Sequence, residues 1–379
     1  MIARTIENKV FQSIKQQKVI LIYGARRVGK TVLQQIMGER FQGRVTHMNG
    51  ESEMTKQLFA LRTESNYRQI LSDTDLLIID EAQAVPEIGL ILKFIVDTVP
   101  HIAVLATGSS SFELQNQVGE PLVGRSTTFH LFPFSFDEMA DAEGRIHLMS
   151  RKEELLIYGC YPEVQQISDF TEKERYLTEL AQAYLMKDIL SIEGVKNSNK
   201  MMSLLKLIAM QMGSETSYDE LGRQLGLSRN TVEKYLDLLT KTFVLYRLPA
   251  FSRNARKEVT KAGKWYFRDN GIRNAIIGDF RPIGLRNDIG SLWESFLINE
   301  RIKLTTNRGK AARYYFWRNY SGSEIDLIEE CQDGISAFEF KWGGKMPSVP
   351  KSFAEAYPDV SYKVVNQGNY LDYLVGSDS

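Results

Sequence analysis

Short apolar runs and amphipathic segments alternate through the first third of the chain. Residues 19–23, 76–79 and 102–106 are continuous apolar runs of the length expected for buried strands. The stretch TVLQQIMG, which starts at Thr31, has the spacing of a helix and follows the loop after the first run. Strands that alternate with helices are typical of a parallel sheet covered by helices. The pattern therefore predicts an α/β domain over residues 1–145.

The pattern changes twice beyond residue 145. Residues 146–275 begin with helical spacing, in ERYLTELAQAYLMKDIL and NKMMSLLKLIAMQMG, and end in strand-like runs. Residues 276–379 predict one helix, GSLWESFLINERIKL, and then the strand-like runs RYYFWRN, GSEIDLIEE, ISAFEFKW and SYKVVNQ. We therefore predict a multi-domain α/β chain divided into residues 1–145, 146–275 and 276–379.

The loop after the first apolar run carries the clearest motif. Residues 24–31, GARRVGKT, fit the pattern GxxxxGK[ST] between a strand and a helix, which is the context of a phosphate-binding loop. Glycines there let backbone N–H groups turn toward phosphates at the positive end of the helix. Lys30 would neutralise the β- and γ-phosphates, and Thr31 would supply an oxygen to Mg²⁺. The residues predicted to bind ATP are Gly24, Arg26, Arg27, Val28, Gly29, Lys30, Thr31, Val32, Asp80 and Ser109.

Two later segments place polar groups directly after apolar runs. The run at 76–79 ends in Asp80 and Glu81, at the edge of an open α/β sheet where ligands bind. We expect Asp80 to hold Mg²⁺ and Glu81 to polarise the attacking water, so ATP hydrolysis is the predicted reaction. After the run at 102–106, Ser109 is expected to contact the γ-phosphate or the water. A helix cap is the alternative role for this serine.

Arg125 is a candidate source of positive charge from a second copy of the chain. It precedes a further strand-like run, from which it would reach a neighbouring subunit's phosphate as an arginine finger. The alternative is an ordinary surface or intramolecular role. Arg26 and Arg27, inside the phosphate loop, are other candidates for supplying charge. Because such an arginine finger acts on a second copy of the chain, we also predict a homo-oligomer.

The segment SYDELGRQLGLSRNTVEKYLDLLTKTFVLYRL fits a helix-turn-helix. Ser217 and Glu220 predict a capping box at the first helix, Gly226 lies in the turn, and Ser228 caps the second helix. The second helix would present its polar residues outward, as a helix that reads a DNA groove does.

The hairpin that follows is rich in positive charge. Residues 241–268 contain eight Lys or Arg and one acid, Glu258, and they predict a wing that contacts phosphates. The residues predicted to contact DNA are Arg229, Asn230, Lys234, Arg253, Arg256 and Lys257. A protein-binding winged helix or a solvated basic hairpin is the alternative.

Four charged residues of the last third follow the order E…D…ExK of restriction-endonuclease-like enzymes. Glu294 lies on the predicted helix, Asp326 on the second strand, and Glu339 with Lys341 on the third. Glu294, Asp326 and Glu339 would bind Mg²⁺. Glu339 and Lys341 would act in catalysis, with Lys341 orienting or deprotonating the water. A solvated strand face, or a nuclease-like core without activity, is the alternative.

Composition excludes several classes of protein but does not identify the function. The formal net charge is +0, so a surface for nucleic acid has to be local. Cys160 and Cys331 are far apart, and the four histidines are scattered, so neither a disulfide framework nor a zinc site is indicated. No apolar run approaches the ~18 residues that span a bilayer, so a cytoplasmic protein with no membrane partner is expected.

Five stretches resemble one known family. IYGARRVGKT, LLIIDEAQ, LATGSSSFEL, GRSTTFHLFPFSFDE and GCYPEV are similar to prokaryotic AAA-type ATP-binding proteins with a carboxyl-terminal nuclease-like domain of unknown function. The resemblance implies a P-loop parallel-sheet ATPase core, a winged-helix middle and a restriction-endonuclease-like end. It places nucleotide binding on Gly29, Lys30 and Thr31, the second acidic motif on Asp80 and Glu81, and a nuclease-like site on Glu294, Asp326, Glu339 and Lys341. No acidic-Pro pair precedes the second strand, which departs from the nuclease pattern.

Two functions follow from these predictions. The first is a Mg²⁺-dependent ATPase coupled to a DNA-binding winged helix and a nuclease-like domain. The second is a nucleotide-regulated switch that binds a protein partner and whose nuclease-like domain is inactive. A small-molecule kinase fits less well, since the Asp-Glu pair suits water as the phosphoryl acceptor.

Overall fold

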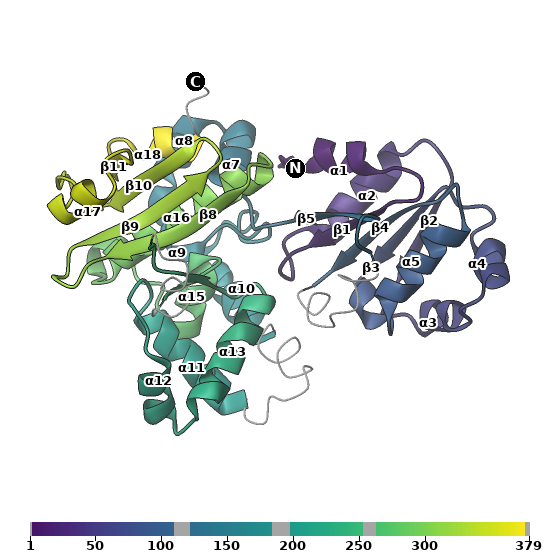
Figure 1. Cartoon of the computed structure of the whole chain (residues 1–379), viewed down its shortest axis with the longest axis horizontal. Coiled ribbons are helices and arrows are strands. Elements are labelled where there is room, and N and C mark those ends of the chain that lie inside the picture. The colour runs from purple at the N-terminus through teal and green to yellow at the C-terminus, as the bar shows by residue number, and fades with distance from the viewer. Residues whose placement is uncertain (1, 110–121, 184–197, 253–262, 376–379) are drawn as a thin grey trace. The chain divides into compact units, whose positions relative to one another are not determined.

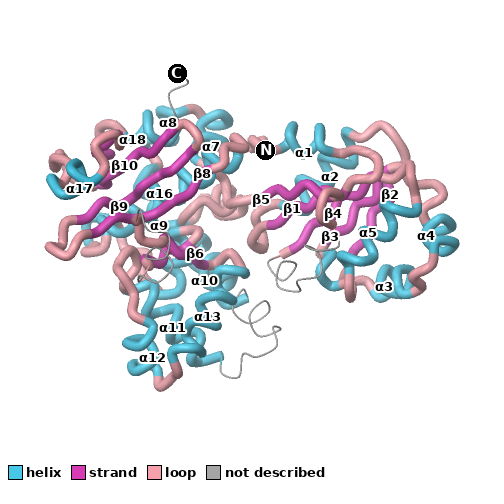
Figure 2. The backbone as a smooth tube through the Cα atoms, in the orientation of Figure 1, coloured by secondary structure: helices cyan, strands magenta, loops and turns pink. Residues whose placement is uncertain are grey.

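The computed structural model describes residues 2–109, 122–183, 198–252 and 263–375. The chain divides into two compact units, one of residues 3–133 with 241–243 and one of the remaining residues. Figure 1 labels many of their helices and strands, and Figure 2 colours them by type. The division predicted at residues 145 and 275 stays a prediction; the second and third predicted segments lie almost wholly in one unit.

The first unit is built on a parallel sheet. Its strands are β1 (Val19–Tyr23), β2 (Val45–Asn49), β3 (Leu76–Asp80), β4 (Ala103–Gly108) and β5 (Ser126–His130). They lie in the order β2-β3-β4-β1-β5, and each neighbouring pair is parallel. The parallel sheet predicted from the sequence is therefore confirmed.

Helices cover both faces of this sheet. They are α1 (Glu7–Ser13), α2 (Lys30–Arg40), α3 (Glu53–Ala60), α4 (Glu64–Ile70) and α5 (Ile88–Thr98), with the short 3₁₀ helix η1 (Ala82–Ala84). Helix α5 shares a core with Leu77 and Ile79 of β3. The neighbouring residue Ile78 points to the other face, where it lies against Gly38 of α2. Because both faces are buried, the strands are continuous apolar runs rather than alternating ones.

The second unit begins with helices and a small hairpin. Its elements up to residue 285 are α7 (Phe136–Glu143), α8 (Arg145–Ser150), α9 (Lys152–Tyr158), α10 (Phe170–Ala183), α11 (Ser198–Met210), α12 (Tyr218–Leu225), α13 (Arg229–Lys241), β6 (Leu245–Leu248), β7 (Lys264–Phe267), α15 (Asn270–Ile277) and η3 (Ile283–Leu285). Strands β6 and β7 pair antiparallel, with Leu248 opposite Lys264.

A long helix and a four-stranded sheet complete this unit. The elements are α16 (Ile289–Asn307), β8 (Ala312–Arg318), β9 (Glu324–Cys331), β10 (Gly334–Phe340), α17 (Lys351–Ala356), β11 (Ser361–Val365) and α18 (Tyr370–Val375). The sheet order is β11-β10-β9-β8; β8, β9 and β10 are antiparallel neighbours, and β11 runs parallel to β10. The backbone of Phe251, beyond β6, donates to the Phe316 carbonyl of β8 at 2.6 Å, which joins the hairpin to the sheet.

Helix α16 is buried nearly all round, and its charged residues are paired inside the unit. The Lys303 ammonium donates to Glu300 Oε1 at 2.6 Å and to the Phe134 carbonyl at 2.9 Å. Glu300 Oε2 accepts from the Phe136 amide at 2.6 Å. Removing one partner of such a pair would leave an uncompensated buried charge, so α7 and α16 are held together tightly.

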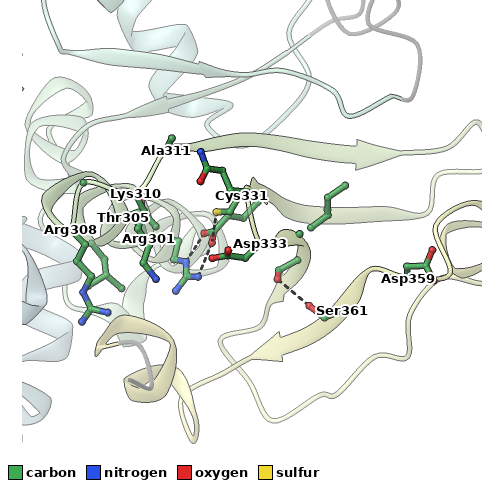
Figure 3. Close-up of a pocket in the computed structure, with 16 residues that line it drawn as sticks. Arg301, Thr305, Arg308, Lys310, Ala311, Cys331, Asp333, Asp359 and Ser361 are labelled. Carbon is green, nitrogen blue, oxygen red and sulfur yellow. Dashed lines mark hydrogen bonds and ion pairs between the residues drawn. The ribbon is translucent and has the colours of Figure 1, made fainter. Parts of the chain in front are cut away.

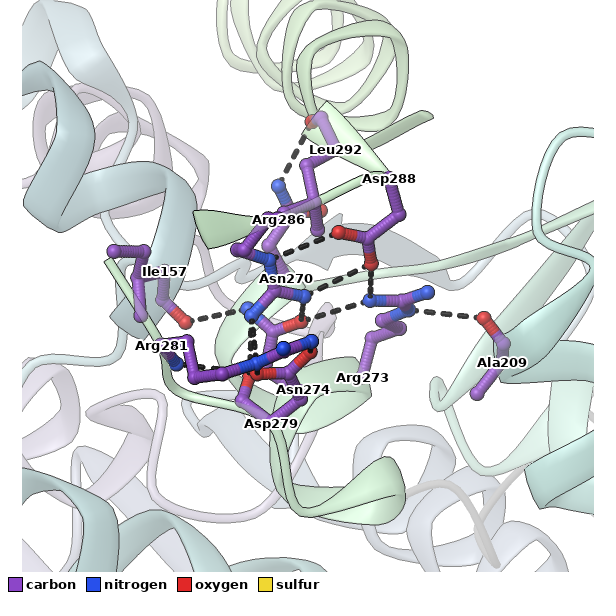
Figure 4. A network of polar contacts seen from close by, with 10 residues as sticks. All are labelled: Ile157, Ala209, Asn270, Arg273, Asn274, Asp279, Arg281, Arg286, Asp288 and Leu292. Atoms are coloured by element: carbon purple, nitrogen blue, oxygen red, sulfur yellow. Dashed lines mark hydrogen bonds and ion pairs between the residues drawn. The ribbon is translucent and has the colours of Figure 1, made fainter. Parts of the chain in front are cut away.

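A buried polar network joins four helices of this unit (Figure 4). Asn274 donates to the Ile157 carbonyl at 2.7 Å, and its Oδ1 accepts from Arg273 and Arg286, each at 3.0 Å. Arg273 also donates to the Ala209 carbonyl at 2.9 Å. Since Asn274 is fully buried, these bonds satisfy groups that would otherwise be costly to remove from water. The network fixes α9, α11 and α15 against the start of α16.

Gly159 and Asp269 are packed against each other. Asp269 accepts from the Cys160 amide at 2.8 Å and from the Gly271 amide at 2.8 Å, which caps α15. Gly159 has a left-handed φ of 71°, and a Cβ atom there would lie only 1.9 Å from Asp269 Oδ1. Only glycine fits this site, because both the backbone angle and the close carboxylate exclude a side chain.

Among the helices that the structure describes, none has both the length and the apolar character needed to cross a membrane.

Candidate functional site

The phosphate loop connects β1 to α2, and both motif glycines have a structural reason. A Cβ atom on Gly24 would lie 2.3 Å from the Leu131 carbonyl oxygen, so the backbone approaches too closely for a side chain. Gly29 has a φ of 99° immediately before α2 begins. The loop therefore brings its backbone to the amino terminus of α2, where an anion is favoured.

The predicted charged residues meet at the carboxyl edge of this sheet, here called the phosphate edge (residues 24–34, 80–83, 107 and 109). Lys30 is buried, and its ammonium donates to the Gly24 and Ala25 carbonyls, each at 2.9 Å. Thr31 Oγ1 donates to Asp80 Oδ2 at 2.8 Å. Asp80 follows from β3 and Thr31 from α2, so the fold joins two motifs that lie 49 residues apart in the chain.

Asp80 is held in place by two neutral donors that are not among the residues predicted to bind ATP. Gln34 Nε2 donates to Asp80 Oδ1 at 2.9 Å, and Thr107 Oγ1 donates to the same oxygen at 2.5 Å. Gln34 also bonds Thr107. The signal that was available is the spacing: Gln34 lies three residues after Thr31, so both face the same side of α2.

Glu81 adopts an unusual backbone conformation and has its own partner. Its φ of 48° and ψ of 44° are left-handed, which is uncommon for a glutamate. The Gln83 amide donates to the Glu81 carboxylate and also to Ser109 Oγ, the latter at 3.0 Å. Gln83 thus joins Ser109 to Glu81, and the contact of Ser109 with the γ-phosphate or the attacking water stays a prediction.

The other residues predicted to bind nucleotide surround this loop. Val28 is buried and serves the core, whereas Val32 is 43% exposed on α2. Arg27 is exposed with a φ of 61°, and Arg26 is half-buried. Their contact with ATP stays a prediction.

Arg125 lies at the opposite edge of the sheet. Its carbonyl accepts from the Val19 amide at 3.0 Å, at the start of β1, whereas the phosphate loop follows the end of β1. The length of β1, at ~3.3 Å per residue, therefore separates the Arg125 backbone from the phosphate loop by roughly 15 Å. Its guanidinium pairs with Asp97 at 2.6 Å. A contact with its own phosphate edge is therefore excluded, and the finger directed at another copy stays a prediction.

The residues at the phosphate edge suit Mg²⁺. A hydroxyl and a carboxylate, Thr31 Oγ1 and Asp80 Oδ2, already point at each other, and both are oxygen ligands of the kind Mg²⁺ prefers. Neutral donors around Asp80 leave its negative charge to be met by a metal ion.

A second group of charged residues assembles in the other unit, and we call it the acid cluster: Lys264, Glu294, Glu324, Asp326, Glu339 and Lys341. Glu339 and Lys341 form an ion pair at 2.5 Å. Asp326 Oδ2 accepts from the Phe340 amide at 2.8 Å. The charges of Asp326 and Glu294 interact, as do those of Asp326 and Glu339. The four residues of the predicted E…D…ExK set are thus brought together.

Strand β7 contributes two side chains that the E…D…ExK pattern does not include. Lys264 forms an ion pair with Glu324, and its ammonium lies 3.5 Å from Glu294 Oε1. Tyr266, two residues further on the same strand, donates to Glu294 Oε1. The Lys264 ammonium also lies 5.3 Å from the centre of the Phe316 ring.

Burial shifts the protonation of this cluster. Removal from water, followed by the charge of Asp326, raises the pKa of Glu294 to about 7. Burial likewise raises the pKa of Asp326 and of Glu339. Burial alone would lower the pKa of Lys264, but the charges of Glu294 and Glu324 outweigh it and the pKa is raised. Lys264 therefore stays a cation.

The cluster as it stands does not present a metal site. Among the described residues, no three His, Cys, Asp or Glu side chains form a group that could hold a metal ion. Neighbouring lysines already pair with the acids: Lys264 pairs with Glu294 and Glu324, and Lys341 pairs with Glu339. One feature points the other way, since Glu339 Oε2 is buried without a hydrogen-bond partner among the described residues. The metal role of Glu294, Asp326 and Glu339 stays a prediction.

Helices α12 and α13 are joined by a tight turn at Gly226, whose φ is 63°. The Glu220 amide donates to Ser217 Oγ at 3.4 Å, but the Glu220 carboxylate accepts from Gln224, so only half of the predicted capping box is present. Ser228 accepts from the Thr231 amide at 3.2 Å and caps α13, as predicted.

The polar face of α13 is solvent-exposed but carries both charges. Arg229, Asn230 and Lys234 are exposed, and so are Glu233 and Asp237. The Arg229 guanidinium lies 3.4 Å from Asp219. The remaining predicted DNA contacts, Arg253, Arg256 and Lys257, lie outside the described residues. Lys264, counted within the basic hairpin, is buried in the acid cluster, so its inclusion in a phosphate-binding surface was wrong.

A cavity of about 670 Å³ lies elsewhere in the same unit (Figure 3). It is lined by residues of α16, β9 and β10 with their connections, among them Arg301, Lys310 and Asp333. Arg301 already pairs with Glu329 of the same wall, with Nη2 at 2.7 Å from Oε1. Side chains of both charges line it, and none of the residues predicted from the sequence is among them.

Comparison with protein families matches three consecutive segments. Residues 16–140 match the model described as AAA domain, residues 149–282 match "Domain of unknown function (DUF8612)", and residues 289–375 match "Domain of unknown function (DUF4143)". The first match contains every residue of the phosphate edge, and with the parallel sheet it supports a P-loop AAA-type ATPase core. The winged-helix and nuclease-like assignments receive no such support.

Curated relatives extend over nearly the whole chain but are themselves uncharacterized. A protein of Mycobacterium tuberculosis is 24% identical over 352 residues, which cover 92% of this chain and 76% of the relative. One from Methanocaldococcus jannaschii is 24% identical over 390 residues, covering 96% of this chain and 84% of the relative. One from Haemophilus influenzae is 27% identical over 187 residues, covering 46% of each chain.

Solved structures overlap only loosely. A RuvB mutant of Thermotoga maritima is 17% identical and covers 66% of this chain and 91% of its own, with a TM-score of 0.33. A STAND-type signal transduction ATPase of Pyrococcus horikoshii is 12% identical and covers 82% and 48%, with a TM-score of 0.34. Both scores are too low to indicate a shared arrangement of the whole chain.

Proposed function

We propose that this chain is an ATPase that hydrolyses ATP at the phosphate edge. The observation that carries the proposal is the meeting of Lys30, Thr31, Asp80 and Glu81 at one edge of the parallel sheet. The AAA-domain match over the same residues supports it. The Lys30 ammonium donates to backbone carbonyls, and the oxygens of a bound phosphate would take their place as acceptors.

The residues divide the reaction between them. The loop amides and Lys30 bind the β- and γ-phosphates, and Thr31 with Asp80 would hold Mg²⁺, which neutralises charge on the phosphates. Glu81 accepts a proton from water as the water oxygen bonds the γ-phosphorus and the bond to ADP breaks. Gln83 fixes the Glu81 carboxylate beside Ser109.

Phosphate release by Glu81→Gln, compared with Glu87→Gln, tests this function. Glu87 is a matched control because it too is a glutamate with a left-handed φ, 53°, but it pairs with Arg62 away from the loop. We expect turnover to fall by about 10²–10³-fold in Glu81→Gln, with ATP still bound, since a general base contributes on this order. Equal rates in the two variants would exclude Glu81 as the base.

We also propose that α13 contacts DNA as the second helix of a winged helix-turn-helix. Its capped start, its buried apolar face and its exposed Arg229, Asn230 and Lys234 support this role. The mixed charge of the face predicts modest affinity from these residues alone, since phosphate contacts require cations.

Charge reversal tests the DNA contact. Arg229→Glu with Lys234→Glu should weaken binding to duplex DNA and reduce the salt dependence, with the slope of log K against log salt falling by roughly 1 per lost contact. The control, Arg68→Glu with Arg175→Glu, makes the same charge change at exposed arginines of other helices. An identical loss in both pairs would show that only net charge matters.

A second function is favoured by one observation. Lys264 pairs with Glu294 of the predicted nuclease site and with Glu324, two residues before Asp326, so the chain would act as a nucleotide-controlled binding switch that does not cut DNA. Incubation of branched, linear and single-stranded DNA with ATP and Mn²⁺ distinguishes the two functions. Cleavage that is lost in Lys341→Ala favours the nuclease; intact DNA favours the switch.

A further inference from the structure

A buried lysine of the small hairpin pairs with acids of the acid cluster that lie on the long helix and the four-stranded sheet. Lys264 begins β7 in the small hairpin, whereas Glu324 begins β9 in the four-stranded sheet and Glu294 lies on α16. The Lys264 side chain is only 3% exposed, against 28% for Glu324 and 16% for Glu294. Its ammonium is thus the innermost charge of these three.

The position of this ammonium is fixed from several sides. The ion pair with Glu324, the 3.5 Å contact with Glu294 and the face of the Phe316 ring surround it. The same strand orients Glu294 a second time through the Tyr266 hydroxyl. Its backbone is paired with β6. Because burying a lysine is costly unless it is paired, the acids and the lysine stabilise one another.

A metal ion bound by Glu294 and Glu324 needs the oxygen atoms that Lys264 now uses. A divalent cation bound by carboxylates takes several oxygens at ~2.0–2.6 Å, and a neighbouring ammonium group repels it. Here the acids face an ammonium instead, and no described group of three ligands is arranged for a metal ion. The predicted Mg²⁺ site and the observed side chains therefore disagree.

We propose that Lys264 is the built-in cation of the acid cluster, taking the place that a divalent metal ion would occupy between Glu294 and Glu324. The cluster is then a metal-free ion-pair core that joins β7 to α16 and β9. This inference concerns the second unit alone and does not depend on ATP hydrolysis.

Titration of the nucleotide-free chain with Mn²⁺ tests the proposal. Bound Mn²⁺ is measured as the loss of the electron paramagnetic resonance signal of free Mn²⁺. The variants are Asp326→Asn, Lys264→Met and the double variant. Methionine keeps most of the length of the side chain and removes its charge. Weak binding at Thr31 and Asp80 is common to all of them and cancels in the comparison. Lys173→Met is the matched control, because Lys173 is also 3% exposed and paired with one acid, Glu154.

The wild-type chain and Asp326→Asn should bind Mn²⁺ equally. Lys264→Met should bind one further ion, roughly tenfold or more tighter than any site in the wild type, and the double variant should lose it. Lys173→Met should behave as the wild type.

Two results would overturn the proposal. A Mn²⁺ ion that the wild type binds and Asp326→Asn loses would show that the metal site is open with Lys264 in place. This comparison holds even if Lys264→Met does not fold, which circular dichroism would report. A folded Lys264→Met that gains no ion would show that the lysine does not stand in for a metal.

Discussion

The two charged sites of this chain each hold a buried lysine beside acids, but the lysines are engaged differently. At the phosphate edge Lys30 donates to backbone carbonyls, and Asp80 accepts from the neutral side chains of Thr31, Gln34 and Thr107. In the acid cluster Lys264 pairs with Glu324 and Glu294. Carbonyls and amides keep charges in position without neutralising them, whereas ion pairs neutralise them. The first site is prepared for a charged ligand, and the second has already satisfied its charges.

The largest expected effect separates the sites by activity. Thr31→Ala should lower ATP turnover about 10²-fold, since it removes an oxygen from the expected Mg²⁺ shell. Asp326→Asn should leave turnover unchanged. Steady-state phosphate release measures both. A comparable loss in Asp326→Asn would mean that the acid cluster takes part in ATP hydrolysis and that the two sites do not have separate roles.

The second expectation concerns stability. Lys264→Met should lower the free energy of unfolding by about 3 kcal/mol, because it leaves buried carboxylates without their cation. Lys30→Met should change it by less than about 1 kcal/mol, because neutral carbonyls lose one donor. Urea unfolding followed by fluorescence provides both values. Similar losses would show that Lys30 too is part of a fixed ion-pair core.

The third expectation uses the protonation of Glu294. Its pKa in the folded chain is raised to about 7 from an ordinary 4.5, so the folded form binds the proton more tightly than the unfolded form. The stability from this group is therefore fully present below pH 4.5 and is lost as the pH rises through 7. Glu294→Gln should flatten the decline in melting temperature between about pH 5 and 8. An unchanged slope would assign the decline to another group.

The smallest expected effect tests the positioning of Glu81. Gln83→Ala should lower kcat roughly tenfold while KM for ATP changes little, because the Glu81 carboxylate loses its fixed donor but the phosphate loop is untouched. Gln69→Ala is the matched control, because it removes an exposed glutamine from α4, outside the phosphate edge. A rise in KM with constant kcat would place Gln83 in ATP binding instead.

Local motifs were predictable from the sequence, and contacts between distant strands were not. GARRVGKT and the Asp80-Glu81 pair define the phosphate edge, because each motif carries its own strand and loop. Gln34 was missed since a helix glutamine has no motif. Lys264 was missed because charge counting along the hairpin treats each lysine as exposed. Only the pairing of β7 with its neighbours shows that this one faces inward.

The contact of Gly159 with Asp269 constrains how this chain can change over generations. A side chain at 159 requires both a different backbone angle at that position and a smaller residue at 269, and a smaller residue at 269 removes the acceptor for the Cys160 amide and the cap of α15. Each single substitution therefore leads to a weakened intermediate. We expect the two positions, 110 residues apart in the chain, to vary together or not at all, so that GCYPEV and the start of α15 behave as a single heritable unit.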